Sequence, residues 1–354
     1  MKRLKNLKTV VPPVFILFFT VYFLAEPELA ADAIRRGLIM CGSTVIPSLF
    51  PFMTLSSFIA RSGAAEKLGR VFSPVTRKVF GLPPECSACI IMGLVGGYPT
   101  GVKTAYEMYS GGIISKESAR RLMLFCVNAG PSFVTGAVGL SIYGNEKIGT
   151  IFAVSCVVSS LLMGVILRFG RRGRVTEESG KIKSPRTKLT EAFVLAAADS
   201  SAAMISICTW VLIFQSFSSC IYLLKLPEKA MSCILPALEI TTGVQNAAAG
   251  LSPEAVCAFL AFAGLSVHCQ LMKYIRGADL GYIKFLASRI VHALLASGVC
   301  FLLLRIFPCG ETVFSNGAVS LPETLTSSSV PAAAALLLMC VIFIMSRTES
   351  SFKA

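Results

Sequence analysis

The sequence of 354 residues is poor in charge: Asp, Glu, Lys and Arg make up 15% of it, whereas 54% of its residues are hydrophobic. A chain this apolar, with a mean hydropathy of +0.72, cannot bury all of its hydrophobic surface in a soluble core. We therefore predict an all-α polytopic membrane protein whose main partner is the lipid bilayer.

Acidic residues are scarce relative to basic ones, 19 against 33, which gives a formal net charge of +14. Such a charge can indicate nucleic-acid binding, but here the basic residues occupy short loops beside apolar runs. That distribution follows the positive-inside rule of membrane proteins. It predicts no nucleic-acid partner.

Histidine is nearly absent, with His268 and His292 as the two in the chain. This scarcity argues against a His-based metal centre or a catalytic triad, so we predict neither an enzyme nor a cofactor. Most of the 13 cysteines lie in apolar segments, and Cys86 and Cys89 have neither a second pair nor a nearby histidine. The pattern favours neither a disulfide framework nor a zinc site.

Residues 92–101, MGLVGGYPTG, interrupt an apolar run with glycines and a proline. Glycine is permissive and proline lacks an amide donor, so a helix should break here. Each flanking arm of about 10 residues spans about 15 Å, which is half of the roughly 30 Å hydrocarbon core. Residues 86–110 are therefore predicted to form a re-entrant hairpin, with a kinked spanning helix as the alternative.

In transporters, such breaks in a helix bind substrate. The stretch is no phosphate-binding loop, because no Gly-Lys-Ser/Thr follows it.

The first half is interpreted from its apolar runs and basic loops. Residues 1–33, with basic residues followed by an apolar run, are predicted to form an uncleaved transmembrane anchor with a cytoplasmic amino terminus. Residues 34–169 form a first repeat, and the basic residues 170–190 form a cytoplasmic linker. The repeat is predicted to contain a span at 37–60 bent by Pro47 and Pro51, a surface helix, the hairpin, a span at 122–142 interrupted at 128–132, and a span at 148–169.

Residues 191–307 repeat the first half in outline. The same landmarks recur in order: a long apolar segment, a hairpin broken at 239–243, a helix start at 251–255, and a broken span in which FLAFAGLS (259–266) matches FCVNAGPS (125–132). When the membrane crossings are counted, the first hairpin opens to the cytoplasm and the second to the outside. The two repeats are therefore predicted to be inverted relative to one another, as in secondary transporters. Residues 308–354 add an external loop, a last transmembrane helix and a cytoplasmic tail. The prediction is about eight transmembrane helices plus two re-entrant hairpins in two inverted repeats.

The combination of GGYPTG at 96–101, ISKESA at 114–119 and NAGPSF at 128–133 resembles sporulation integral membrane proteins of the YlbJ type, which carry the nucleoside-recognition or Gate domain. The resemblance implies a transporter-like protein of endospore-forming bacteria that moves dipicolinate across the outer forespore membrane during sporulation. It carries over eight motif positions as candidate substrate-binding residues: Gly97, Tyr98, Pro99, Thr100, Gly101, Asn128, Gly130 and Pro131. The second repeat departs from the pattern, with Glu239 in place of Gly97.

Polar residues inside apolar segments are costly and mark functional candidates. Glu239 could bind substrate or a coupling ion, or stabilise a helix end. Lys103 could neutralise an anionic substrate, or pair with Glu107 four residues later. Asp199 could relay an ion or anchor its helix at the interface, and His268 could couple transport to protons or pack as a hydrogen-bonded side chain. The other candidates for substrate binding in the breaks are Ser132, Thr241, Thr242 and Gly243.

These features favour a transporter for a small organic anion, with dipicolinate as the solute that the resemblance implies. A transporter for a nucleoside-like solute and a non-transporting membrane scaffold for spore assembly are the alternatives. Coupling to protons or sodium, and assembly as a homo-oligomer, stay open. A dianion would need positive charge, which the helix starts after Gly101 and Gly130 and the Lys103 ammonium could supply. A neutral solute would need none.

Overall fold

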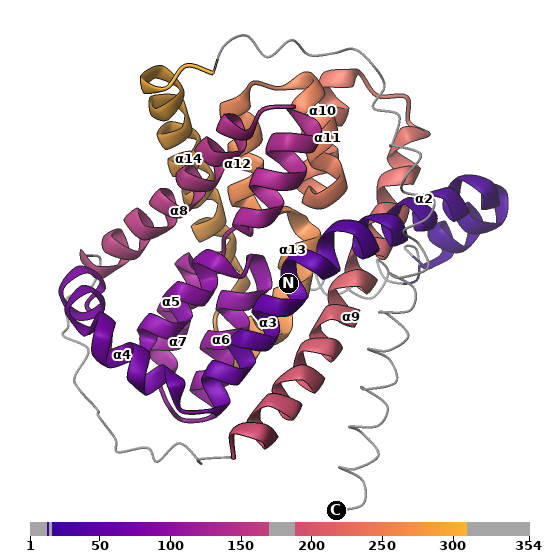
Figure 1. Cartoon of the computed structure of the whole chain (residues 1–354). Coiled ribbons are helices and arrows are strands. Elements are labelled where there is room, and N and C mark those ends of the chain that lie inside the picture. Colours follow the sequence, from indigo (N-terminus) through magenta and orange to yellow (C-terminus); the bar gives the residue numbers. More distant parts are fainter. Residues whose placement is uncertain (1–12, 14–15, 170–187, 310–354) are drawn as a thin grey trace, which may run out of the picture.

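The computed structural model describes residues 13, 16–169 and 188–309, and within these ranges it contains helices and no β-strand (Figure 1). Five helical segments there are long and apolar enough to cross a membrane: Pro27–Arg61, Glu146–Phe169, Leu189–Tyr222, Pro253–Gly277 and Tyr282–Ile306. The chain is thus an all-helical membrane protein, as predicted. Most of the basic linker, the last predicted span and both termini lie outside the described residues.

The first long segment joins α2 (Pro27–Met40) to α3 (Ile46–Arg61) through one π-helical turn, η1 (Cys41–Val45). The Ile46 amide donates to the Cys41 carbonyl, five residues back, immediately before Pro47. Proline has no amide to donate, so the regular hydrogen-bond ladder is disturbed at this place. The span predicted at 37–60 is therefore present, with a π turn before Pro47. The bend predicted at Pro47 and Pro51 stays a prediction.

A short helical connection, α4 (Ala64–Val75) with η2 (Thr76–Phe80), leads to the first hairpin. The hairpin consists of α5 (Cys86–Val95) and α6 (Tyr98–Ser110), with its break at Gly96 and Gly97. The two arms approach closely, because a Cβ atom on Gly101 would lie 2.7 Å from the Cα of Gly93. Small residues permit such close packing of helices in membranes. The predicted helix, break and helix are confirmed, and their re-entry into the membrane stays a prediction.

The broken span of the first half follows. α7 (Lys116–Phe125) starts at the predicted place, where the Ser115 hydroxyl accepts the Ser118 amide, a cap worth about 1 kcal/mol. The helix stops at Phe125, residues 126–130 are not helical, and η3 (Phe133–Ile142) continues the span. The interruption predicted at 128–132 is thus present. α8 (Glu146–Phe169) then packs against η3, with Gly139 and Gly149 in backbone contact.

The second half has the same order of elements after the long helix α9 (Leu189–Tyr222). A hairpin of α10 (Glu228–Leu238) and α11 (Ile240–Gly250) breaks at Glu239. A span made of α12 (Pro253–Phe262) and α13 (Gly264–Gly277) breaks at Ala263, and α14 (Tyr282–Ile306) follows. The landmarks matched in the sequence therefore coincide with element boundaries.

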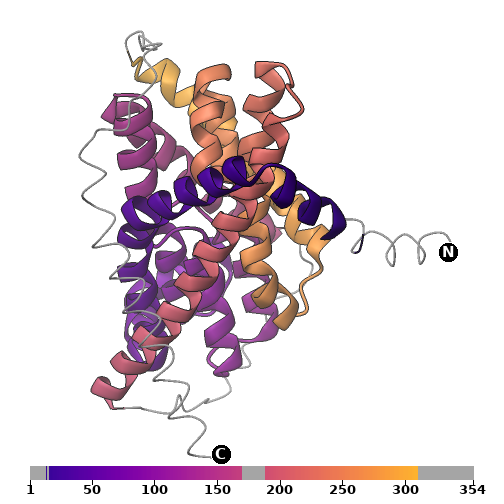
Figure 2. The same ribbon diagram turned by 90° about the vertical axis from the view of Figure 1, so that its right-hand side faces the viewer.

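The two hairpins lie at opposite ends of the molecule. In Figure 1, α5 and α6 lie with α7 in the lower part, whereas α10, α11 and α12 lie in the upper part. Figure 2 shows the same separation after a 90° turn, with the salmon-to-orange second hairpin at the top and the purple first hairpin in the lower part. The breaks themselves are in the core, since Val127, Ile240 and Ala263 are fully buried.

Candidate functional site

The break in the first hairpin touches the break in the first broken span. Gly97 has φ +85° and ψ −178°, a conformation that is essentially restricted to glycine. A Cβ atom on Gly97 would lie 2.7 Å from the side chain of Leu49 and 3.4 Å from the Cα of Gly130. A larger residue at Gly97 would push the two breaks apart, which explains glycine in both motifs.

The second half repeats this contact. A Cβ atom on Gly264, which has φ +68°, would lie 3.0 Å from the amide nitrogen of Ile240 and 3.1 Å from the carbonyl oxygen of Pro236. Gly243 packs against the opposite arm of its hairpin, where a Cβ atom would lie 2.5 Å from the nitrogen of Pro236. In each half, the broken span thus rests on the broken hairpin.

A small cavity of about 30 Å³ lies where the breaks of the two halves meet. Four residues predicted from the sequence line it, namely Tyr98, Pro99, Gly130 and Thr241. Ser48 on α3 and Gln270 on α13 add polar side chains, and apolar residues of η1, α3, η3, α9 and α13 complete the lining. This volume holds about one water molecule and is far smaller than pockets for organic ligands. Binding of a solute here therefore requires the surrounding segments to move apart.

Tyr98 and Thr100 of the first motif have different roles. The Tyr98 hydroxyl donates to the carbonyl of Leu260 at 2.8 Å. That carbonyl needs a donor, because α12 ends two residues later. The Thr100 hydroxyl donates at 2.7 Å to the carbonyl of Gly96, within its own hairpin. Tyr98 thus links the two halves of the chain, whereas Thr100 stabilises the turn.

Asn128 connects the break of the first span to its neighbours. Its side-chain nitrogen donates to the Gly93 carbonyl at 3.3 Å and lies 3.1 Å from the hydroxyl of Ser160. Its Oδ1 atom is buried and has no hydrogen-bond partner among the described residues, which costs about 1–3 kcal/mol. Pro131 is half-buried, and Ser132 is exposed and does not line the cavity. Asn128 therefore leaves a free acceptor in the interior.

Glu239 caps the start of α11 and is 1% exposed. Its carboxylate accepts the amides of Thr241 at 3.0 Å and Thr242 at 2.7 Å. The Thr242 hydroxyl also lies 2.7 Å from Oε2, and the Ser266 hydroxyl lies 3.5 Å from Oε1. In residues 16–169 and 188–309, no Lys or Arg forms an ion pair with Glu239. Glu239 thus makes the helix-end contact that was predicted as the alternative to a role in binding.

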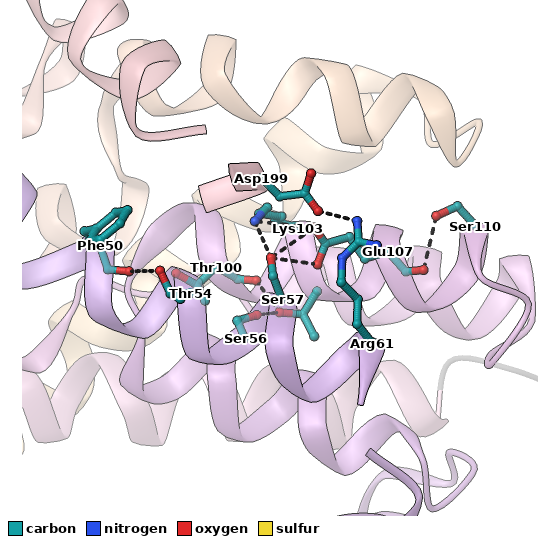
Figure 3. A network of polar contacts seen from close by, with 11 residues as sticks. Phe50, Thr54, Ser56, Ser57, Arg61, Thr100, Lys103, Glu107, Ser110 and Asp199 are labelled. Atoms are coloured by element: carbon teal, nitrogen blue, oxygen red, sulfur yellow. Dashed lines mark hydrogen bonds and ion pairs between the residues drawn. The ribbon is translucent and has the colours of Figure 1, made fainter. Parts of the chain in front are cut away.

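Lys103 belongs to the polar network drawn in Figure 3. None of the residues labelled there lines the cavity. Its buried ammonium lies 2.5 Å from Ser57 Oγ and 3.3 Å from a carboxylate oxygen of Glu107. Ser57 also donates to Glu107, at 3.2 Å. Lys103 therefore forms the i,i+4 pair with Glu107 that the sequence analysis gave as the alternative to a substrate role.

Asp199 extends this network to α9, as Figure 3 shows. It forms an ion pair with Arg61 at the end of α3, and the two side chains are 39% and 38% exposed. Partly exposed pairs of this kind contribute at most about 1 kcal/mol. Of the two roles predicted for Asp199, the geometry favours the anchor.

His268 and Arg289 satisfy the carbonyls that broken helices leave free. His268 Nε2 lies 3.0 Å from the carbonyl of Phe262, the last residue of α12, and Nδ1 lies 3.3 Å from the Tyr282 hydroxyl. This arrangement favours the hydrogen-bonded packing role for His268. Arg289 on α14 is fully buried and donates to the carbonyl of Val127 at 2.8 Å and to the carbonyl of Leu124.

Arg289 was not predicted from the sequence as a functional residue. The two carbonyls that it contacts lie at the end of α7, where a positive charge is favourable. An arginine inside the apolar run 282–306 was the available signal, since intramembrane charges are rarely without a role. The partner of Arg289 lies in a different half of the chain and cannot be inferred from local spacing.

Comparison with known proteins identifies one part of the chain. No curated protein and no solved structure matches it. Residues 43–146 match the family model of the Gate domain, which is described as nucleoside recognition. This range contains the first hairpin and both breaks of the first half. Residues 43–146 are thus similar to the domain that the resemblance of the motifs predicted.

Proposed function

We propose that the protein is a membrane transporter for a small organic solute, which binds where the breaks of the two halves meet. The observation that carries this proposal is the shared cavity, lined by Tyr98 and Pro99 of the first hairpin, Gly130 of the first broken span, and Thr241 of the second hairpin. Secondary transporters bind their substrates at such junctions of broken helices. The Gate domain supports a transporter-like membrane protein over an enzyme.

Two inverted repeats, at residues 34–169 and 191–307, would give this transporter its alternating access. Gly101 and Gly243 support the repeat, because each lies in the first turn of a second hairpin arm and packs on the first arm. The opposite positions of the two hairpins in Figure 1 support the inversion. Residues 1–33 and 308–354 would then be additions outside the repeats, and 170–190 the linker.

For the solute, we propose a small organic anion. A helix start carries about half a positive charge, and first-turn residues of α6, α11 and α13 line the cavity together with Gly130. The Glu239 carboxylate offsets part of this potential. The positive potential that remains at the cavity favours an anionic solute, even without a contribution from Lys103. Dipicolinate as the solute, and the outer forespore membrane as the location, rest on the motif resemblance.

A nucleoside-like solute is the second candidate. The cavity lining contains no Lys or Arg among the described residues, but it contains the uncharged hydrogen-bonding side chains of Ser48, Tyr98, Thr241 and Gln270. Such groups suit the hydroxyls and base edges of a nucleoside better than the charge of a dianion. The description of the matched family as nucleoside recognition supports the same candidate.

A flux assay separates these candidates. The purified full-length protein is reconstituted into lipid vesicles, and uptake of labelled dipicolinate and of labelled uridine is measured with each unlabelled compound as competitor. Empty vesicles provide the control. Dipicolinate uptake that uridine does not inhibit supports the anion, and the reverse result supports the nucleoside. Uptake of neither solute, with the protein folded in the vesicles, would favour the membrane scaffold and contradict both transport candidates.

A further inference from the structure

The helix α4 turns an apolar stripe away from the protein. Val71 and Val75, one helical turn apart, are 72% and 51% exposed, and Phe72 beside them is also exposed. Thr76 and Phe80 of η2, which follows directly, are buried. A surface helix of a soluble protein turns its apolar stripe toward the core. The stripe of α4 faces outward and therefore needs an apolar environment.

The segment lies where a spanning helix ends. On α8, which is long and apolar enough to cross a membrane, Val158, Leu162 and Ile166 are exposed and recur every four residues, so they form one face that can contact lipid chains. At the end of this helix, Nη1 of Arg168 donates to the carbonyl of Val79 in η2 at 3.3 Å. Figure 1 shows α8 ending beside α4 at the lower left. The α4–η2 segment is thus at the level of the lipid headgroups.

Basic side chains border the apolar stripe. Together, α4 and η2 contain four basic residues and one acidic residue. Lys67, Arg70 and Lys78 are exposed, and none of them forms an ion pair with a carboxylate whose side chain the structure describes. Lys67 lies one helical turn from Val71, on the same side of α4. Apolar residues flanked by such cations are complementary to the acyl chains and the phosphate of an anionic lipid.

The segment is fixed to the base of the first hairpin. Arg121 on α7 donates to the carbonyl of Phe80 at 2.8 Å and to the carbonyl of Gly81 at 3.2 Å. The chain then continues through the buried Leu82 to the start of α5 at Cys86. The depth of α4 and η2 in the membrane therefore determines the depth at which the first hairpin begins.

We propose that α4 and η2 form a binding site for an anionic phospholipid of the bilayer. The acyl chains contact Val71 and Val75, and the phosphate contacts Lys67, Arg70 and Lys78. A second copy of the chain fits this surface poorly, because a two-fold contact would bring the same cations together. The bound lipid holds the base of the first hairpin at the membrane surface. Lipid binding does not depend on the proposed transport function.

Quenching of a single tryptophan by brominated lipids tests the site. Val71→Trp is combined with Trp210→Phe, which removes the one native tryptophan, and the full-length protein is reconstituted into mixed vesicles. One of the two lipids, phosphatidylglycerol or phosphatidylcholine, is brominated in each series. Phosphatidylglycerol should bind next to the introduced indole with a constant about fivefold above that of phosphatidylcholine, the factor expected for one cation near an anionic surface. Lys67→Gln, Arg70→Gln and Lys78→Gln together should make the two constants equal.

The controls separate this site from a general effect of charge. Lys147→Gln, Lys225→Gln and Arg305→Gln together remove three exposed basic residues elsewhere, and this variant should keep the fivefold preference. Val154→Trp, which places the indole on the exposed face of α8, should show no preference for either lipid. Val75→Trp provides a second indole on the apolar stripe and should reproduce the result of the first.

Three results would overturn the inference. Equal binding of the two lipids beside α4 would mean that the basic residues do not recognise the phosphate. A preference that persists after all three basic residues of the site are replaced would place the anionic lipid elsewhere. Absence of quenching by both lipids would mean that a protein surface, from a second copy or another partner, covers the stripe. None of these results bears on solute uptake, so failure of this inference and failure of the transport function are distinguishable.

Discussion

The hydroxyl of Tyr98 donates a 2.8 Å hydrogen bond to the carbonyl of Leu260, a residue 162 positions further along the chain. One partner begins the second arm of the first hairpin, and the other lies in the last turn of α12. The bond thus joins a motif of the Gate domain to the second half, which the family model does not cover. It makes the position of the first hairpin dependent on the broken span of the other half.

Tyr98→Phe should therefore destabilise the protein by about 1–3 kcal/mol, because it leaves the buried Leu260 carbonyl without a donor. The measurement is the midpoint of thermal unfolding in detergent. Tyr222→Phe is the matched control, since Tyr222 is exposed and its hydroxyl contacts Asn246 at 3.3 Å. Equal midpoints for the two variants would show that the bond between the halves contributes nothing.

Gly97→Ala should abolish solute uptake while the protein still reaches the membrane. The new Cβ would lie 2.7 Å from the Leu49 side chain, and the backbone conformation of this position costs a residue with a side chain about 1–3 kcal/mol. The expected result is a change in how the hairpin meets Gly130, measured as loss of uptake at normal expression. Gly136→Ala is the control, because a Cβ atom there meets nothing within 4 Å. Normal uptake in Gly97→Ala would show that this close contact is dispensable.

The breaks could be predicted from the sequence because glycine and proline act locally. Gly97, Pro99 and Gly130 end or start helices through their own conformational preferences, whatever surrounds them. Glu239 was also predictable as a candidate, since an acidic residue in an apolar segment needs a partner. Ser115 marked the start of α7 by a hydrogen bond that spans only three residues.

The partners of the buried polar residues could not be predicted in the same way. Arg289 contacts carbonyls 162 and 165 positions away, and no local pattern encodes that distance. For Lys103, the spacing permitted both a pair with Glu107 and a contact with substrate. The choice depends on which side of α6 faces the cavity, and this is set by packing against Ser57 of α3.

Asp279 joins the turn after α13 to the start of α7. Its carboxylate lies 2.6 Å from the ammonium of Lys116 and 3.7 Å from the guanidinium of Arg120. The hydrogen bond from Lys116 and its positive charge hold the pKa of Asp279 below the usual value. The lowered pKa means that this contact stabilises the fold above the unfolded-state pKa of about 3.9. The stabilisation is lost as the pH falls through the folded-state pKa.

Asp279→Asn at neutral pH should consequently reproduce what strong acid does to the wild type. We expect faster amide hydrogen exchange in the first turn of α7, and a smaller difference between variant and wild type at high salt, which screens exposed charges. Asp32→Asn is the control, because Asp32 pairs with Arg35 on the surface of α2, within one helix. Unchanged exchange in Asp279→Asn would mean that the hydrogen bond from the Arg120 side chain (Nε) to the carbonyl of Ala278 is enough to hold this turn.

Lys103→Gln should destabilise the protein by about 3 kcal/mol, because it removes one partner of a buried ion pair. The Glu107 carboxylate, whose side chain is 20% exposed, would remain with Ser57 as its hydrogen-bond donor. The midpoint of thermal unfolding measures this effect. The double variant Lys103→Gln with Glu107→Gln should recover most of the stability, since no unpaired charge is left behind.

The same double variant decides whether Lys103 meets the solute. If the helix starts at the cavity supply the positive potential, dipicolinate uptake by the double variant should match the wild type, because the Lys103 charge is already neutralised by Glu107. A double variant of normal stability that has lost dipicolinate uptake would contradict this expectation. It would mean that the ammonium leaves Glu107 and Ser57 for the solute in another conformation, which is the substrate role predicted from the sequence. Uridine uptake in the same vesicles serves as the control, because a neutral solute needs no cation in either conformation.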